Sequence, residues 1–197
     1  AGSLLVYADV TTPSHAGDVQ LRLAHEFFGE GRFNDALDAY QRALRANPPA
    51  DRRAARSGLV QSALRVAEFS TARAEAETLL AESPEDPSAL ALYADALWAS
   101  GLFEEAEGHY RNALGRTPDL ARGRHGLARA LAARSHLEAA LDEAQAALRL
   151  APRDLEVHHT VGAVYERLHR YEEAAAAYSN YVNLLPNKDR SDKADWS

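Results

Sequence analysis

This chain of 197 residues contains no cysteine and no methionine. Without cysteine it can form no disulfide, no thiolate nucleophile and no cysteine-ligated zinc site. No stretch approaches the roughly 20 apolar residues that span a bilayer, and the first residues lack a basic-then-apolar targeting signal. We therefore expect a soluble protein without membrane insertion. The sequence leaves a cytoplasmic and a periplasmic or secreted location equally open.

Basic residues are also fewer than acidic ones. Lysine and arginine number 22 against 29 acidic residues, which gives a net charge of −7 and an isoelectric point near 5.6. Bulk nucleic-acid binding requires a basic field, so nucleic acid is not an expected partner. The abundant residues are alanine, leucine, arginine and glutamate, which favour helix.

A fixed spacing of prolines and alanines runs through the sequence. The prolines are separated by 36, 34, 34 and 34 residues, and an alanine precedes each at the same offset. A repeat of this length is typical of a stacked helical array, and such arrays usually hold other proteins. The positions are Pro48, Pro84, Pro118, Pro152 and Pro186, with Ala36, Ala72, Ala106, Ala140 and Ala174.

The third unit shows the plan of one repeat. Asp86-Pro87 is an N-cap followed by a proline in the first helical turn. Gly101 then ends the first helix, and a second helix runs from about Phe103 to the residue before Pro118. One face of the first helix carries apolar residues at helical spacing, namely Leu90, Tyr93, Ala94 and Leu97.

These residues resemble the tetratricopeptide repeat, whose first helix has a large-then-small pair followed by an aromatic. Its second helix carries alanine, an aromatic and alanine, and a proline closes the unit. The resemblance implies an all-α, right-handed superhelix of five helix-turn-helix repeats. We expect repeats at about 17–50, 53–86, 87–120, 121–154 and 155–188. An extended or disordered leader would occupy 1–16, where Ala1-Gly2-Ser3 looks like a cloning remnant, and residues 189–197 would begin a capping helix.

The chain departs from the family pattern at two kinds of position. The aromatic of the second helix is replaced by Ala76 and Ala144, so we expect thinner packing in those two repeats. The tryptophan often found early in the first helix is replaced by Gln20, Arg56, Leu90, Arg124 and His158.

The resemblance also implies a binding surface, because the first helices of such arrays line a concave groove. Phe28, Leu64 and Trp98 would supply apolar anchors. Arg122, His125 and Arg129 would form a cluster that takes an acidic side chain, with His159 beside it and Arg65 on the opposite flank. A solvated helix face and, for Trp98, core packing are the alternatives. The predicted groove residues are Leu21, His25, Phe28, Gln61, Leu64, Arg65, Asp95, Trp98, Arg122, His125, Arg129 and His159.

No pattern in the sequence indicates catalysis or a cofactor. The eight histidines include no HExxH pair, and a zinc site needs three or four convergent ligands. Paired carboxylates such as Glu104-Glu105 fall in first helical turns, where the helix dipole accounts for them. We therefore predict no metal site, no cofactor and no enzyme activity.

The expected function is that of a protein-interaction scaffold binding a peptide or partner segment in the groove. Two alternatives remain. Exposed terminal faces of the array could stack on another copy. The chain could also be an accessory region of a larger bacterial enzyme, since residues 183–188 weakly resemble the segment before secreted aspartyl-protease domains. The lysine and asparagine clamp that binds chaperone tails is absent, as these positions hold Leu21, His25, Gln61, Ala91 and Asp95.

Overall fold

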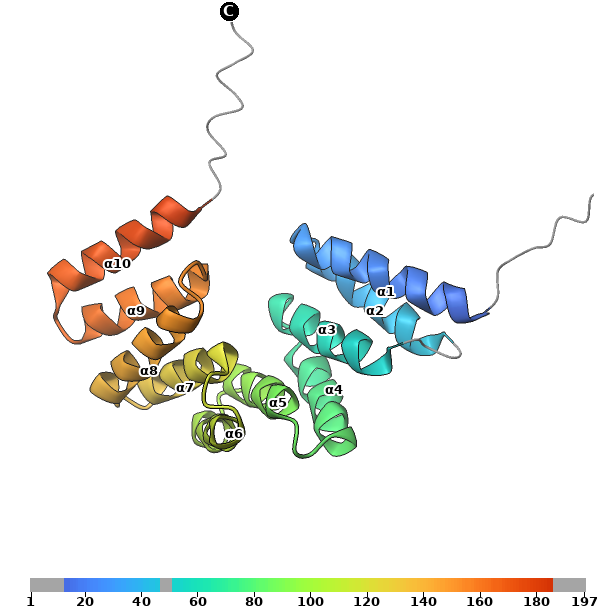
Figure 1. Cartoon of the computed structure of the whole chain (residues 1–197), viewed down its shortest axis with the longest axis horizontal. Helices are drawn as coiled ribbons and strands as arrows, with labels where there is room; N and C mark the ends of the chain where they lie inside the picture. Colours follow the sequence, from blue (N-terminus) through green and yellow to red (C-terminus); the bar gives the residue numbers. More distant parts are fainter. Residues whose placement is uncertain (1–12, 47–50, 186–197) are drawn as a thin grey trace, which may run out of the picture. The chain divides into compact units, whose positions relative to one another are not determined.

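The computed structural model describes residues 13–46 and 51–185 of the chain. Within these ranges the chain forms ten α-helices and no β-strand (Figure 1). The helices are α1 (Pro13–Gly29), α2 (Phe33–Arg45), α3 (Arg52–Arg65), α4 (Phe69–Glu82), α5 (Pro87–Ala99), α6 (Phe103–Arg116), α7 (Ala121–Ala133), α8 (Leu137–Leu150), α9 (Leu155–Arg167) and α10 (Tyr171–Leu184).

The first helix begins earlier than the sequence pattern predicts. We expected a leader over 1–16, whereas α1 begins at Pro13. Proline is favoured in the first helical turn, where its missing N–H has no partner to lose. The rest of the predicted leader and the predicted capping segment at 189–197 lie outside the described residues.

The helices form two compact units, α1 to α4 and α5 to α10. Within each unit, every helix packs against the next one in the chain. The first helices of successive repeats also contact each other, α1 with α3 in one unit, and α5 with α7 and α7 with α9 in the other. In each unit the first helices therefore form a shared surface that the second helices support.

The turn inside each repeat has a left-handed residue at the same position. Gly31 and Gly101 have φ of 76° and 81°, and three non-glycine residues adopt the same conformation, Ala67 (φ 62°), Ser135 (63°) and His169 (59°). The left-handed region strains residues that carry a Cβ. These turns therefore keep their geometry even where the sequence lacks the glycine that favours it.

Small residues allow the helices to pack closely, and aspartate caps fix where several of them begin. The repeated alanines Ala36, Ala72, Ala106 and Ala140 are completely buried, as close backbone approach requires. The helices α3, α5 and α9 begin with aspartate N-caps, whose carboxylates accept backbone N–H groups. Asp51 accepts from Ala54 at 2.8 Å and Asp86 from Ala89 at 2.9 Å.

A tyrosine and a glycine mark the contact between some successive repeats. A Cβ added to Gly58 would overlap the ring of Tyr40 from the preceding repeat, and one added to Gly126 would overlap the ring of Tyr110. In the repeat where Ala144 replaces the tyrosine, Thr160 stands at the position equivalent to Gly126. Where the second helix has a large tyrosine, the next first helix therefore has glycine, and where it has a small alanine, the next first helix has a larger residue.

Polar residues replace tryptophan early in four of the first helices, and three of these residues bond the partner helix or the preceding loop. Arg56 donates to Glu75 at 3.0 Å, and the equivalent Arg124 to Glu143 at 2.8 Å. Arg124 Nε also donates to the carbonyl of Pro118 at 3.0 Å. His158 lies 2.9 Å from the equivalent carbonyl, that of Pro152. These side chains link each first helix to its partner helix or to the preceding loop.

Candidate functional site

The predicted groove residues fall into two sets, one in each compact unit. Leu21, His25, Phe28, Gln61, Leu64 and Arg65 lie on α1 and α3. The other six lie on α5, α7 and α9, and these are Asp95, Trp98, Arg122, His125, Arg129 and His159.

The set on α1 and α3 is built around aromatic contacts. The His25 ring meets the Tyr40 ring edge-on at 5.6 Å, and Phe28 meets Phe33 edge-on at 5.2 Å. The Arg65 guanidinium lies 5.4 Å from the centre of the Phe33 ring. His25 and Arg65 are exposed, whereas Phe28 and Phe33 are half-buried.

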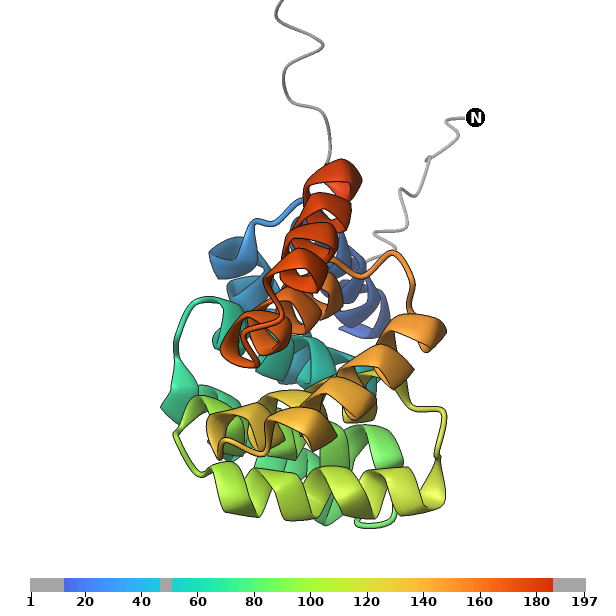
Figure 2. The ribbon, with the colours of Figure 1, turned by 90° about the vertical axis from the view of Figure 1, so that its left-hand side faces the viewer.

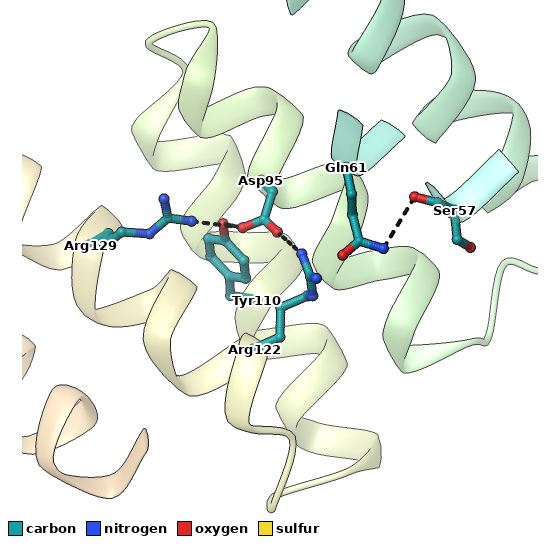
Figure 3. Close-up of polar contacts among 6 residues, drawn as sticks. All are labelled: Ser57, Gln61, Asp95, Tyr110, Arg122 and Arg129. Carbon is teal, nitrogen blue, oxygen red and sulfur yellow. Dashed lines mark hydrogen bonds and ion pairs between the residues drawn. The ribbon is translucent and has the colours of Figure 1, made fainter. Parts of the chain in front are cut away.

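Three further members of this set have simpler surroundings. The Gln61 amide donates to the carbonyl of Ser57, one turn earlier, at 3.3 Å (Figure 3). Leu21 and Leu64 are half-buried. The surface of α1 and α3 therefore offers apolar side chains with polar groups at their borders.

The set on α5 and α7 is organised by one buried carboxylate, that of Asp95. Its Oδ1 accepts from the Tyr110 hydroxyl at 2.5 Å and from Arg129 at 2.8 Å, and its Oδ2 accepts from Arg122 at 2.8 Å (Figure 3). The carboxylate therefore joins three helices, since Tyr110 lies on α6. Burial and the nearby carboxylate raise the pKa of Tyr110 well above its ordinary value, so the phenol stays a hydrogen-bond donor.

The Arg129 guanidinium lies over the Trp98 ring, 4.4 Å from its centre. Trp98 also meets Phe103 of α6 at 6.1 Å. Trp98 is half-buried, so it contributes both to packing and to the surface. Within the described part of the chain, the Trp98 indole nitrogen and Arg129 Nε are buried without a hydrogen-bond partner. The guanidinium therefore covers one face of the indole, and both side chains remain partly exposed.

The two histidines of this set have different surroundings. His125 is buried, and its Nε2 lies 2.8 Å from the Thr160 hydroxyl of α9. Burial, assisted by the charge of Arg129, lowers the pKa of His125 to about 4. His159 is exposed, and its ring meets those of Tyr178 and Tyr181 at 5.9 and 6.0 Å. His125 is therefore a neutral packing residue at pH 7, and His159 is a surface residue.

Sequence reasoning did not identify the role of Tyr110. Its spacing predicts a core residue, but the hydroxyl that holds Asp95 has no sequence signal of its own. Glycine at 58 and 126, both two residues before the small position of the first helix, is the one available clue to the tyrosine contacts. Among the described residues, no three histidines or carboxylates gather as a metal site would require.

The sequence profile of the tetratricopeptide repeat matches residues 21–59, 57–121 and 125–189. The chain belongs to the tetratricopeptide repeat family. This match covers most of the sequence, and it confirms the family predicted from the spacing of prolines and alanines. Tetratricopeptide repeat proteins generally act as non-catalytic scaffolds for other proteins, which supports a protein-interaction role for this chain in general.

Solved structures show the same fold. The chain is similar to TTC0263, a thermophilic tetratricopeptide repeat protein of Thermus thermophilus, with a TM-score of 0.78 and 23% identity over 88% of this chain and 93% of that one. It is also similar to MamA of Desulfovibrio magneticus, with a TM-score of 0.60 and 16% identity over 90% and 99%. These similarities confirm the predicted fold class, an all-α solenoid of tetratricopeptide repeats.

A third similar structure belongs to a larger assembly. The APC/C hetero-tetramer Cut9–Hcn1 matches with a TM-score of 0.72 and 21% identity, over 88% of this chain and 34% of the matched chain. No curated protein matches the chain significantly. Of the helices that the structure describes, none combines the length and the apolar character needed to cross a membrane.

Proposed function

We propose that the surface formed by α5 and α7 binds a partner segment that carries an acidic side chain next to an apolar one. The observation that carries this proposal is the pair Arg122 and Arg129, which bond the Asp95 carboxylate from opposite sides at 2.8 Å each (Figure 3). The side chains of Arg122 and Arg129 remain 40% and 25% exposed. The acidic group would meet these arginines, and the apolar group would meet Trp98.

Pre-organisation is the physical reason for this assignment. A free arginine loses rotamer entropy when it binds a ligand, at a cost of about 0.5–1.5 kcal/mol for each immobilised side chain. Arg122 and Arg129 are already held by Asp95, so less entropy remains to be lost. Guanidinium groups form strong, directional bonds to carboxylates. A segment that approaches the exposed edge of Arg122 therefore meets a group already in place.

The charge of Glu156 opposes acidic ligands at this surface. Glu156 is an exposed residue of α9, and its charge acts on both Arg129 and His125. The two positive charges of the arginines are balanced by the two negative charges of Asp95 and Glu156. The surface therefore exerts little long-range attraction on an acidic segment. Affinity for an acidic segment would come from short-range bonds, and the removal of Glu156 would strengthen it.

The test begins with a library of random peptides displayed on phage and selected on the purified chain. We expect the selected peptides to be enriched in aspartate or glutamate beside an aromatic or aliphatic residue. Fluorescence anisotropy with one labelled selected peptide then compares variants. R122Q is expected to weaken binding about fivefold to tenfold, or about 1 kcal/mol, and E156Q to tighten it.

A matched control is Arg111 of α6, a second-helix arginine whose side chain is 59% exposed and pairs with Glu107. R111Q removes the same charge from a different surface and should leave peptide affinity unchanged. Circular dichroism verifies that each variant is folded. If R122Q and R111Q bind equally well, or if selected peptides lack acidic residues, this site assignment is wrong.

A further inference from the structure

The last described helix, α10, has an exposed apolar stripe. Tyr171, Ala175, Tyr178 and Val182 follow one another at spacings of four, three and four residues, and the C-cap residue Leu185 continues the stripe. Tyr178, in the middle of the stripe, is half-buried because its ring packs on Gly162 of α9. Tyr171 is 63% exposed, Val182 60% and Leu185 40%. Spacing of four and three residues is the pattern by which two helices pack along a common seam. The stripe therefore has the form of a helix-binding face.

Equivalent residues of earlier repeats are covered by the next repeat. Leu114 of α6 corresponds to Val182, is only 8% exposed, and lies against Gly123 of α7. Leu148 of α8 also corresponds to Val182, and it packs on the buried cluster that includes Val157 and Val161 of α9. Among the described helices, α10 contacts only α9. In Figure 2, α10 lies at the front in red, and no other described helix of its unit covers its near side.

Helix α10 carries no charged side chain of its own after Glu173. Residues 174–185 contain no charged residue, and seven of these twelve residues are exposed, in a chain that is 26% charged overall. Depletion of charge at the centre of an exposed surface is characteristic of protein interfaces. Residues 174–185 of two copies bring no charge of their own together. Glu166 of α9 accepts from the Tyr178 hydroxyl at 3.1 Å and so lies beside the middle of the face, whereas Glu172 and Glu173 lie at its start and would repel each other in a parallel arrangement.

We propose that α10 pairs with α10 of a second copy of this chain, in antiparallel orientation about a two-fold axis near Tyr178. This arrangement places Ala175 opposite Val182 of the second copy, and Tyr171 opposite Leu185. At the two Ala175–Val182 contacts a small residue faces a larger one, which lets the helices approach closely there. The antiparallel orientation also keeps the two pairs of N-terminal glutamates at opposite ends of the contact. A two-fold axis closes the assembly at a dimer.

Two other occupants fit the stripe less well. The face of α1 that would continue the repeat carries an exposed Glu26 where α7 and α9 have the buried Ala130 and Val164. Head-to-tail stacking would bury that carboxylate against apolar side chains, which is costly. Residues 186–197 lie outside the described residues, and six of the twelve are charged while only Pro186, Ala194 and Trp196 are apolar, so this segment offers few apolar side chains to cover the stripe.

Sedimentation equilibrium of the 197-residue chain tests the pairing. One helix pair forms a small interface, below about 1,200 Å², so we expect a dimer that dissociates on dilution. Over about 5 to 500 µM, the apparent mass should rise from 21.5 kDa towards twice that value. V182E should raise the dissociation constant about tenfold or more. The matched control V19E changes an α1 residue that is 48% exposed and should leave the dimer intact.

Engineered cysteines then test the orientation, since the chain has none of its own. Under mild oxidation, the double variant A175C/V182C should form a disulfide-linked dimer, whereas each single variant should not, because a disulfide needs Cα atoms within about 7 Å. Links in the single variants would indicate a parallel pair and overturn the proposal. A monomer at every concentration, a dimer unaffected by V182E, or one abolished by V19E would also overturn it. R122Q leaves this pairing unchanged, so failure here does not bear on the peptide surface of α5 and α7.

Discussion

The Tyr110 hydroxyl donates a 2.5 Å hydrogen bond to the buried carboxylate of Asp95, while the Tyr110 ring occupies the space that Gly126 leaves by having no Cβ. One side chain therefore performs two tasks. Its ring joins successive repeats, and its hydroxyl orients the aspartate that holds Arg122 and Arg129. The proposed binding surface and the packing of α6 on α7 are thus physically coupled.

Replacement of Tyr110 by phenylalanine is expected to destabilise the fold. The ring contact with Gly126 is kept, but the buried Asp95 loses one of its donors. A hydrogen bond to a charged group contributes about 1.5–3 kcal/mol, so the free energy of unfolding should fall by about 2 kcal/mol. Urea unfolding followed by circular dichroism measures the change. The control is Y93F, which changes a half-buried tyrosine of α5 whose hydroxyl bonds none of the described residues, so it should have almost no effect.

Substitution of Gly126 by alanine is expected to be destabilising for a different reason. The added Cβ overlaps the ring of Tyr110, and overpacking of a core costs about 1–3 kcal/mol. Gly115 of α6 provides the control, because a Cβ there would meet no atom within 4 Å. In a helix, alanine is favoured over glycine by about 0.8–1 kcal/mol, so G115A should stabilise the protein. Equal effects of the two substitutions would show that Tyr110 yields to the added methyl group.

The sequence was sufficient to predict the helices and their pairing, because proline, alanine and aspartate act on the local backbone. Pro118 ends a helix because it disfavours the helical conformation of the residue before it. Ala106 is small enough for two helices to pack closely. For Asp95, the sequence predicted only the face of the helix on which it lies. In the structure Asp95 is buried, and the Tyr110 hydroxyl bonds it from the next helix. Contacts of this kind depend on the rotamers of side chains from several helices, and helical spacing carries no information about them.

The left-handed turns are a second feature that spacing did not reveal. Glycine at 31 and 101 indicates a left-handed turn, but Ala67, Ser135 and His169 give no such signal and adopt the same conformation. A Cβ in this conformation costs about 1–2 kcal/mol. The hydrogen bonds that close each turn nevertheless hold it, such as the bond from the Glu68 N–H to the Ala63 carbonyl at 2.9 Å.

Glycine at these three positions is expected to stabilise the protein. A67G relieves the strain of the left-handed turn, although glycine also increases the entropy of the unfolded chain by about 0.4–1 kcal/mol. The net gain should be about 0.5–1 kcal/mol for each site, measured as a shift of the urea midpoint. The control A74G places glycine at an exposed position inside the regular helix α4 and should destabilise by about 1 kcal/mol. A loss of stability in A67G would mean that the turn imposes no strain on alanine.

Buried His125 is expected to make the fold sensitive to mild acid. Its pKa is lowered to about 4 in the folded protein, chiefly by burial and then by Arg129, while Asp154, Asp95 and Glu156 oppose the shift. The unfolded chain takes up this proton near the ordinary value of about 6.5. Stability is therefore fully present above about pH 6.5 and is lost as the pH falls towards 4, by about 2–3 kcal/mol at pH 4.5.

The variant H125N isolates this contribution, because asparagine can still bond the Thr160 hydroxyl but does not titrate in this range. Carboxylates elsewhere affect both proteins alike, so the difference in unfolding free energy between wild type and H125N removes their effect. That difference should stay constant between about pH 7 and 8.5, where both states hold a neutral imidazole. It should then move in favour of the variant by about 2–3 kcal/mol between pH 7 and 4.5. A difference that does not change with pH would mean that His125 accepts a proton in the folded state as readily as in the unfolded one.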